Sequence, residues 1–232
     1  RDKNYLEELL HIKKFKNSGK LLDVGANMGF FLRKANEKGF DAIGLDPSES
    51  LSELGKKHFG LNIENSYLNN CSFEDKTFDV ITLIDVFEHL TDPIINLKKI
   101  RSLLKDDGIV CIKVPNANYN KLKLKIFKLL KKHKTKDIFD SYEHVIHYNP
   151  TTMKNMVQKC GFKIIDLFLP MPIQLPVWHK FVGHYYLYPS PFRLDWKLNI
   201  ARNIFYYFGK IEKRLNLPIN FATDLMFILK KN

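Results

Sequence analysis

Residues 21–29, with the sequence LLDVGANMG, constrain the fold of this chain more than any other stretch. Four residues of strand character lead into a turn punctuated by glycines, and a helical pattern follows over residues 30–38. Gly25 and Gly29 have no Cβ, so the backbone there can approach a ligand closely, beside the unpaired N–H groups of the next helix. The stretch therefore predicts the start of a βαβ unit that can bind a polar cofactor.

The spacing of these glycines argues against a dinucleotide as that cofactor. A dinucleotide fingerprint has glycines at offsets one, three and six, and the later two positions here hold Asn27 and Phe30. Residues 41–46 resemble a second strand that ends in Asp46, whose carboxylate could accept hydrogen bonds from both hydroxyls of a ribose. Taken together, the glycine turn and Asp46 resemble motifs of the class I S-adenosylmethionine (SAM)-dependent methyltransferases, with Asn27 in place of a central glycine.

Strand and helix patterns alternate through residue 114, which is typical of a doubly wound α/β sheet. Gly19 is expected to end a leading helix before the first strand. The expected helices are residues 5–15, 30–38, 51–59, 93–104 and 195–215. The expected strands are residues 21–24, 41–46, 61–68, 77–85, 108–114, 162–168 and 224–230.

The resemblance implies a Rossmann-like, seven-stranded sheet that is mostly parallel, with an antiparallel last strand. We expect residues 1–232 to form a single methyltransferase domain. Within it, residues 1–18 contain the leading helix, residues 117–150 form a basic lid segment, and residues 170–220 form a helical and aromatic cap inserted between strands six and seven.

Further motifs narrow the resemblance over residues 20–168. Asp85-Val86-x-Glu88-His89-Leu90 follows the fourth strand, and a Glu143-His144-Val145-x-x-Tyr148-x-Pro150 segment comes later. In this order they look like the motifs of a group of small-molecule methyltransferases. The resemblance implies SAM as the cofactor, bound by Asp23, Gly25, Ala26, Asn27, Gly29, Asp46, Pro47, Tyr67, Leu68 and Asp85.

Methyl transfer from SAM requires alignment of the acceptor with the methyl group and exclusion of water. If the acceptor is a hydroxyl, a histidine close by can remove its proton near neutral pH. His144 is the first candidate and His89 the second, and His147 lies close to His144 in the sequence. The alternatives are that His144 belongs to a structural loop and that His89 is a packing residue beside the cofactor.

The sequence predicts no metal and no disulfide. The histidines are scattered, without an H-x-x-x-D cluster, and the three cysteines form no C-x-x-C pair. Free cysteines, together with the lack of a signal peptide or a membrane-spanning run, favour a cytoplasmic protein.

The net charge of +12 favours anionic partners. Residues 121–136 combine many lysines with an apolar stripe at helical spacing, as in a helix that covers an active site or lies on an anionic membrane. The aromatic insertion permits the same two interpretations, a cap over the acceptor pocket or a membrane interface. We therefore expect either a soluble protein or one that also contacts the inner membrane surface peripherally.

The sequence thus predicts a SAM-dependent methyltransferase, and specifically an O-methyltransferase, for a small or carrier-linked acceptor such as a hydroxyl of a sugar or of a lipid-linked intermediate. The positive charge is also compatible with a nucleic-acid methyltransferase. Base-modifying enzymes of that class usually carry an N/D-P-P-Y type tetrapeptide after the fourth strand, whereas this chain has Asp85-Val86-Phe87-Glu88 there. A non-catalytic scaffold at a membrane surface is the other alternative, and the retained glycine turn and Asp46 argue against it.

Overall fold

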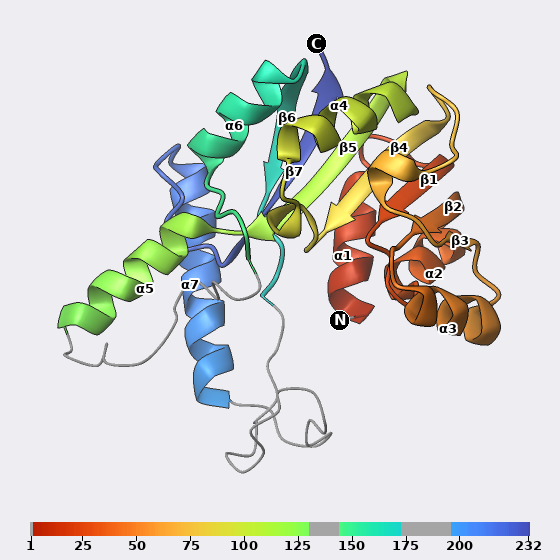
Figure 1. Ribbon diagram of the computed structural model, residues 1–232. Helices are drawn as coiled ribbons and strands as arrows, with labels where there is room; N and C mark the ends of the chain where they lie inside the picture. The colour runs from red at the N-terminus through yellow and green to blue at the C-terminus, as the bar shows by residue number, and fades with distance from the viewer. Residues whose placement is uncertain (1, 130–143, 173–195) are drawn as a thin grey trace.

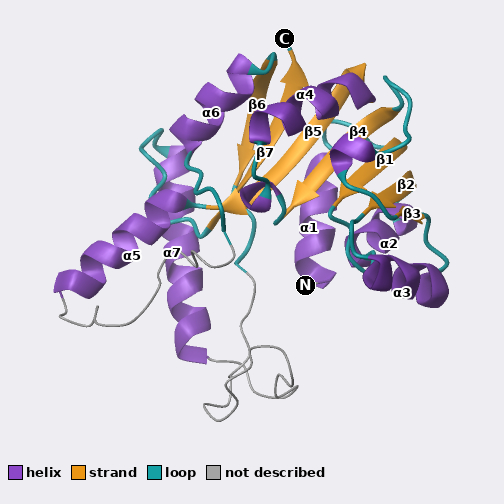
Figure 2. Ribbon diagram, viewed as in Figure 1, coloured by secondary structure: helices purple, strands orange, loops and turns teal. Residues whose placement is uncertain are grey.

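The computed structural model describes residues 2–129, 144–172 and 196–232. Its centre is a seven-stranded sheet with the strand order β3-β2-β1-β4-β5-β7-β6 (Figures 1 and 2). Strands β1 to β5 pair in parallel, whereas β7 pairs antiparallel with both β5 and β6. The strands are β1 (Gly19–Val24), β2 (Phe40–Leu45), β3 (Ile63–Glu64), β4 (Phe78–Ile84), β5 (Leu104–Pro115), β6 (Phe162–Phe168) and β7 (Asp224–Lys231).

Helices cover both faces of this sheet, and neighbouring strand residues face opposite sides. Leu21 contributes to the core beneath α1 and α2, while Leu22 contributes to the core beneath α4 and α6. The α-helices are α1 (Asp2–Ile12), α2 (Phe30–Glu37), α3 (Glu49–Phe59), α4 (Pro93–Leu103), α5 (Ala117–Leu129), α6 (Pro150–Lys159) and α7 (Trp196–Arg214). Two short 3₁₀ helices are η1 (Leu68–Asn70) and η2 (Phe87–His89). The doubly wound fold with a reversed last strand is therefore confirmed.

Two local expectations were wrong. The third strand is only Ile63–Glu64, and η1 follows where the strand was expected to continue. The leading helix ends at Ile12, and Gly19 begins β1 instead of capping the helix. Gly19 has φ +118°, and a Cβ there would lie 2.6 Å from Asp79 Oδ2, so a close approach to Asp79 explains this glycine.

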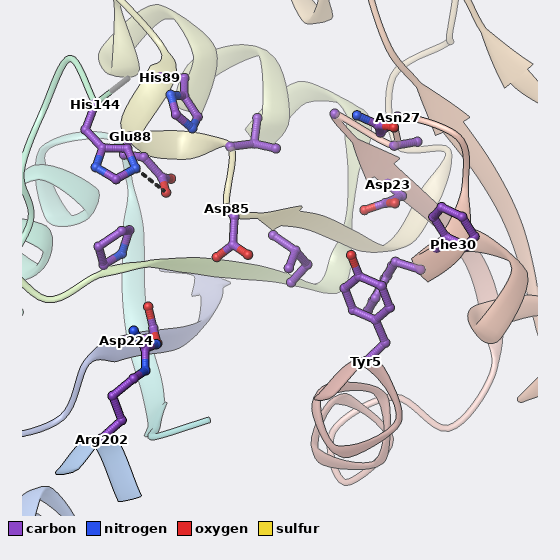
Figure 3. A pocket seen from close by; sticks show the side chains of 16 residues that line it. Tyr5, Asp23, Asn27, Phe30, Asp85, Glu88, His89, His144, Arg202 and Asp224 are labelled. Carbon is purple, nitrogen blue, oxygen red and sulfur yellow. Dashed lines mark ion pairs between the residues drawn. The ribbon is translucent and has the colours of Figure 1, made fainter. Parts of the chain in front are cut away.

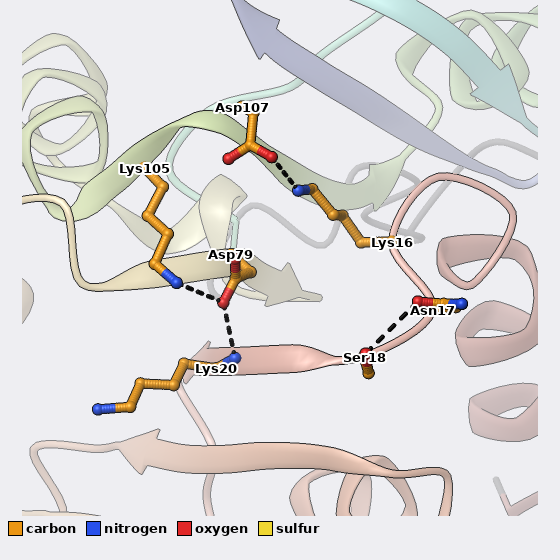
Figure 4. A network of polar contacts seen from close by, with 7 residues as sticks. All are labelled: Lys16, Asn17, Ser18, Lys20, Asp79, Lys105 and Asp107. Carbon is orange, nitrogen blue, oxygen red and sulfur yellow. Dashed lines mark hydrogen bonds and ion pairs between the residues drawn. The ribbon is translucent and has the colours of Figure 1, made fainter.

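Asp79 organises the edge of the sheet where the parallel strands begin (Figure 4). Its Oδ2 accepts hydrogen bonds from the Lys20 backbone N–H at 2.9 Å and from Lys105 Nζ at 2.8 Å. These contacts join the starts of β1 and β4 to β5. Asp79 therefore has a structural position at the edge opposite to the glycine turn.

The segments that surround the other edge are tied together by one buried asparagine. Asn116, directly after β5, donates from Nδ2 to the carbonyl oxygens of Ile219 and Ala222. This fixes the connection between α7 and β7 against the end of β5. Helix α5 also contacts α7, since the rings of Tyr119 and Phe205 have centroids 5.6 Å apart. Both helices extend beyond the carboxyl end of the sheet (Figure 1).

Candidate active site

The glycine turn after β1 consists of alternating left-handed residues. Gly25, Asn27 and Gly29 have φ values of +75°, +54° and +81°. A Cβ on Gly25 would overlap the side chain of Val86, and one on Gly29 would overlap Leu61. Asn27 has room for its side chain, and asparagine tolerates the left-handed region better than most residues do. Its Oδ1 accepts the Met28 N–H at 2.8 Å, which explains how this turn forms without a central glycine.

Asp46 at the end of β2 holds the turn in place. Its side chain is buried, with Oδ2 accepting the Asn27 N–H at 2.7 Å and Oδ1 accepting the Ser48 N–H at 2.9 Å. The carboxylate thus connects the glycine turn to the start of α3. Each carboxylate oxygen retains one lone pair that a ribose hydroxyl could use.

A cavity of about 630 Å³ opens beside the glycine turn, at the carboxyl ends of β1, β4 and β5 (Figure 3). In a parallel α/β sheet this edge is where ligands bind. The volume lies in the usual range for small-molecule sites. Seven of the predicted site residues line the cavity, namely Asp23, Gly25, Ala26, Asn27, Asp85, His89 and His144.

The other predicted cofactor residues lie outside the cavity lining. Gly29 and Asp46 shape the turn, and Pro47 follows Asp46. Tyr67 is exposed, whereas Leu68 is part of the hydrophobic core. The cavity therefore joins the turn to the two histidines but does not include Tyr67 or Leu68.

Asp23 lies at the floor of the cavity and is only 3% exposed. Thr82 Oγ1 donates to its Oδ1 at 2.8 Å. Burial raises the pKa of Asp23 to about 7, against the opposing effect of this hydrogen bond. A carboxyl group in this state favours a cationic ligand, because such a ligand would stabilise its ionised form.

Glu88, His89 and His144 form a cluster at the far end of the cavity (Figure 3). Glu88 Oε1 lies 4.0 Å from His144 Nε2, and the two histidine rings have centroids 5.2 Å apart. The backbone explains this proximity, since the N–H groups of Val145 and Ile146 both donate to the Glu88 carbonyl at 3.0 Å. Burial raises the pKa of the Glu88 carboxyl to about 8. The third candidate, His147, has its ring centroid 6.1 Å from that of His144 and does not line the cavity.

Several cavity residues are not in the predicted set. Glu88 lies within the Asp85–Leu90 motif, so the sequence contained a signal for it. Tyr5 comes from the leading helix, which contributed no residue to the predicted site. Arg202 of α7 and Asp224 of β7 reach the cavity from beyond the insertion (Figure 3), and no local pattern marks them.

The fold and this cavity together define the class of protein. A doubly wound sheet with a reversed last strand, a glycine turn after β1 and an acid at the end of β2 are the features that the sequence motifs predicted for class I SAM-dependent methyltransferases. Residues 1–167 match the sequence model of a family described as "Methyltransferase domain". The chain belongs to this methyltransferase family, and the predicted class and cofactor are confirmed.

Curated relatives and solved structures agree with this assignment. The chain is 27% identical over 175 residues to a ubiquinone biosynthesis O-methyltransferase of Coxiella burnetii (strain Dugway 5J108-111). The aligned region covers 70% of this chain and 70% of that protein. It is 30% identical over 107 residues to the Haemophilus ducreyi protein of the same name, covering 42% of this chain and 45% of that protein. A SAM-dependent methyltransferase described as putative from Listeria monocytogenes has a TM-score of 0.60 at 16% identity, covering 100% of this chain and 98% of that one. A Thermotoga maritima structure described as a possible histamine N-methyltransferase has a TM-score of 0.58 at 17% identity, covering 98% and 89%. At such identities the structures show the shared fold.

None of the helices in the described part of the chain has the length and apolar character needed to span a bilayer.

Proposed function

We propose that this methyltransferase transfers the methyl group of SAM to a hydroxyl group of a small acceptor. One observation carries the proposal: a single cavity has the glycine turn and Asp23 at one end and the Glu88, His89 and His144 cluster at the other. A cofactor held at the turn would present its methyl group toward groups that can accept a proton. The names of the Coxiella and Haemophilus relatives, both O-methyltransferases, support a hydroxyl as the acceptor.

The proposed cofactor contacts follow from the positions of the acids. In this proposal Asp23, which lines the cavity, binds the amine of SAM, and Asp85, also in the lining, contacts the methionine part or the acceptor. Asp46 uses its remaining lone pairs for the ribose hydroxyls, and the main chain at Tyr67 and Leu68 lies against the adenine. In this arrangement the protein binds and orients the cofactor through acids and main chain.

The chemistry that remains for the protein is removal of the acceptor proton. The acceptor oxygen attacks the methyl carbon in line with the carbon–sulfur bond, which breaks and leaves its electron pair on sulfur. His144 is the proposed base and His89 the second candidate, and both line the cavity beside Glu88. The walls contributed by Tyr5 and Phe30 help to exclude water from the reacting atoms.

For the acceptor we propose a sugar or a lipid-linked intermediate. Arg202 provides a cation at the acceptor end of the cavity, and its Nε has no hydrogen-bond partner within the described structure. Outside the cavity, α7 has exposed apolar side chains, which we call the α7 apolar stripe and which are Ile200, Ile204, Tyr207, Phe208 and Ile211. An acceptor with an anionic group and an apolar tail matches this combination. The relatives' role in ubiquinone biosynthesis is consistent with a lipid-like acceptor.

Calorimetric titration with SAM and with its demethylated product tests the cofactor site. We expect Asp46→Ala to weaken binding by roughly 1 to 3 kcal/mol, because charged hydrogen bonds and the support of the turn are lost. Asp41→Ala, at an exposed position on β2, is the control and should bind normally. Absence of binding to the wild-type protein would favour the non-catalytic scaffold over an enzyme.

Transfer of a labelled methyl group from SAM then tests the acceptor class. The acceptors to compare are a polyprenylated phenol, a nucleotide sugar and transfer RNA. Labelling of the phenol or the sugar supports the proposal. Labelling of RNA alone would replace it by the nucleic-acid alternative.

A further inference from the structure

We infer that Glu88, His89 and His144 bind a divalent transition-metal ion of the Zn²⁺ type at the acceptor end of the cavity. The inference rests on the proposed function for the role of the metal, which is to bind the acceptor hydroxyl. Each of the three side chains offers one ligand atom, and these atoms all lie within 4.8 Å of one another. The scattered positions of the histidines in the sequence had predicted no metal, since the ligands come from two distant segments.

The distances in the cluster are close to those of a metal site. With metal–ligand bonds of 2.0–2.2 Å, two ligand atoms on one ion lie roughly 3 to 4.4 Å apart. The separation of 4.0 Å between Glu88 Oε1 and His144 Nε2 falls inside this range. Small side-chain rotations would bring the most separated pair of ligand atoms into it.

Burial of Glu88 gives a second, independent indication of a ligand. The residue is 2% exposed, and its Oε2 has no hydrogen-bond partner within the described structure. A buried carboxylate oxygen without a partner is costly. Lys113, a buried cation that contacts Asp85 of the cavity lining at 3.3 Å, is also engaged by Glu8 at 2.9 Å. A metal ion between Glu88 and the histidines would compensate its charge.

The donor set selects the kind of metal. Two imidazoles and one carboxylate suit Zn²⁺, Co²⁺ and Fe²⁺, whereas Mg²⁺ prefers oxygen ligands alone. Three protein ligands leave positions open for water or substrate, as in catalytic zinc sites. His89 is exposed and His144 partly buried, so an ion can reach the cluster from solvent.

A metal at this position changes how the acceptor loses its proton. The acceptor hydroxyl oxygen occupies an open position on the ion, which lowers its pKa, and the proton passes to water at the cavity mouth. The oxygen then attacks the methyl carbon of SAM, and the carbon–sulfur bond breaks with its electron pair on sulfur. His144 then acts as a metal ligand, and the acidity of the bound hydroxyl replaces the need for a free imidazole base.

Cobalt(II) is the probe for this site, because its visible absorption reports ligand number and geometry. Untagged protein is freed of metal with a chelator, desalted and titrated with CoCl₂, followed by competition with ZnSO₄. We expect one cobalt ion per chain, a visible band typical of four or five ligands, and loss of this band when zinc is added. Absence of the band in the wild-type protein would overturn the inference.

Two substitutions and one control assign the ligands. Glu88→Gln and His144→Ala should each weaken cobalt binding at least tenfold, with retention of fold checked by circular dichroism. His58→Ala removes an exposed histidine on α3 and should bind cobalt as the wild type does. Equal binding by the wild type and both cluster variants would show that the cobalt is held elsewhere and would contradict the inference.

SAM titration of the same metal-free protein separates this inference from the proposed function. SAM binding without cobalt binding would leave the methyltransferase proposal intact and remove the metal. Cobalt binding without SAM binding would support the metal site and contradict the methyltransferase proposal. Addition of ZnSO₄ to protein that binds both should raise the rate of methyl transfer, whereas an unchanged rate would contradict a role for the metal in activating the acceptor.

Discussion

Glu8 of α1 and Lys113 of β5 form an ion pair with 2.9 Å between Oε1 and Nζ, and both side chains are almost fully buried. Lys113 also lies 3.3 Å from Asp85 in the cavity wall. Burial acts to lower the pKa of Lys113, but Asp85, Glu8 and Asp224 outweigh it and raise the pKa above its ordinary value. Burial raises the pKa of Glu8 to about 7 despite Lys113. The pair therefore links the leading helix to Asp85, which directly follows β4 in the active site.

Removal of the cation from this pair should destabilise the protein strongly. We expect Lys113→Met to lower the free energy of unfolding by about 3 to 5 kcal/mol, because Glu8 would remain buried without a cation. Urea denaturation at pH 8 measures the loss. The double variant Glu8→Leu with Lys113→Met should recover most of it, since apolar partners replace the pair.

An exposed ion pair provides the control for this substitution. Lys76 Nζ and Asp106 Oδ2 are 2.8 Å apart, but their side chains are 63% and 71% exposed. Lys76→Met should change the free energy of unfolding by less than about 1 kcal/mol. Similar losses for the two lysine substitutions would contradict the importance assigned to burial.

The pKa of Asp23 predicts a pH dependence of SAM binding. Because its folded pKa of about 7 exceeds the ordinary aspartate value of 3.8, the stability of the free protein falls as the pH rises between these values. A cationic ligand favours the ionised form, so SAM affinity should increase by up to about tenfold per pH unit as the pH approaches 7 from below. Calorimetry between pH 5.5 and 7 in two buffers of different ionisation enthalpy would detect the accompanying proton release.

The matched variant for this prediction is Asp23→Asn, which keeps an acceptor for Thr82 Oγ1. It should bind SAM more weakly and without this part of the pH dependence. Asp41→Asn, on the exposed side of β2, should retain the wild-type profile. An identical pH profile for Asp23→Asn and wild type would show that Asp23 does not contact the cofactor amine.

The sequence predicted those parts of the fold whose signals are local. Residues 162–168 were expected as a strand and form β6, and Pro93 begins α4 behind Asp92, which accepts the Ile95 N–H at 3.0 Å. The third strand could not be predicted well because two residues, Ile63 and Glu64, carry too short a pattern. The role of Gly19 was predicted wrongly because a glycine is needed there for the close approach to Asp79, which lies far away in the sequence.

In the candidate site, too, the sequence predicted the residues that have a local signal and missed those that depend on contacts between distant segments. Asp23 and the glycine turn lie in one continuous motif, so sequence spacing could identify them. The placement of His144 beside Glu88 depends on backbone hydrogen bonds from Val145 and Ile146, which no sequence period encodes. Arg202 lies on α7, far along the chain from most of the other cavity residues, and Asn116 fixes the connection between α7 and β7 by hydrogen bonds that no local pattern encodes.

Left-handed backbone in the glycine turn predicts different outcomes for two substitutions at Asn27. Asn27→Gly should retain SAM binding, because glycine adopts φ +54° without cost. Asn27→Ala should lower the free energy of unfolding by about 1 kcal/mol, since alanine is strained there and the bond to the Met28 N–H is lost. Thermal unfolding and SAM titration of both variants measure these effects.

Gly25→Ala tests the same turn more severely. Its φ is +75°, and the added Cβ would overlap Val86. We expect loss of SAM binding together with a lower melting temperature. The additional change Val86→Ala should recover part of the stability, because it removes the overlap but not the backbone strain. Normal SAM binding by Gly25→Ala would show that the turn does not form the cofactor site.

The α7 apolar stripe predicts binding to anionic membranes. Ile204 and Ile211 are 49% and 52% exposed, and the same helix carries Lys210, Lys213 and Arg214. Apolar contact together with attraction between these cations and anionic lipid would hold the helix in the membrane interface. The protein should therefore sediment with phosphatidylglycerol vesicles and remain in the supernatant with phosphatidylcholine, and added salt should reduce the bound fraction.

A double substitution and a matched control decide whether α7 is the contact. Ile204→Ser with Ile211→Ser should reduce the vesicle affinity about tenfold or more, because two apolar side chains no longer leave water. Since both positions are exposed, the melting temperature should change little. Ile95→Ser alters an isoleucine on α4 that is 52% exposed, and it should sediment like the wild type. Equal recovery of the protein with neutral and anionic vesicles would exclude an anionic membrane as its partner, and the stripe would then have to be explained by the acceptor alone.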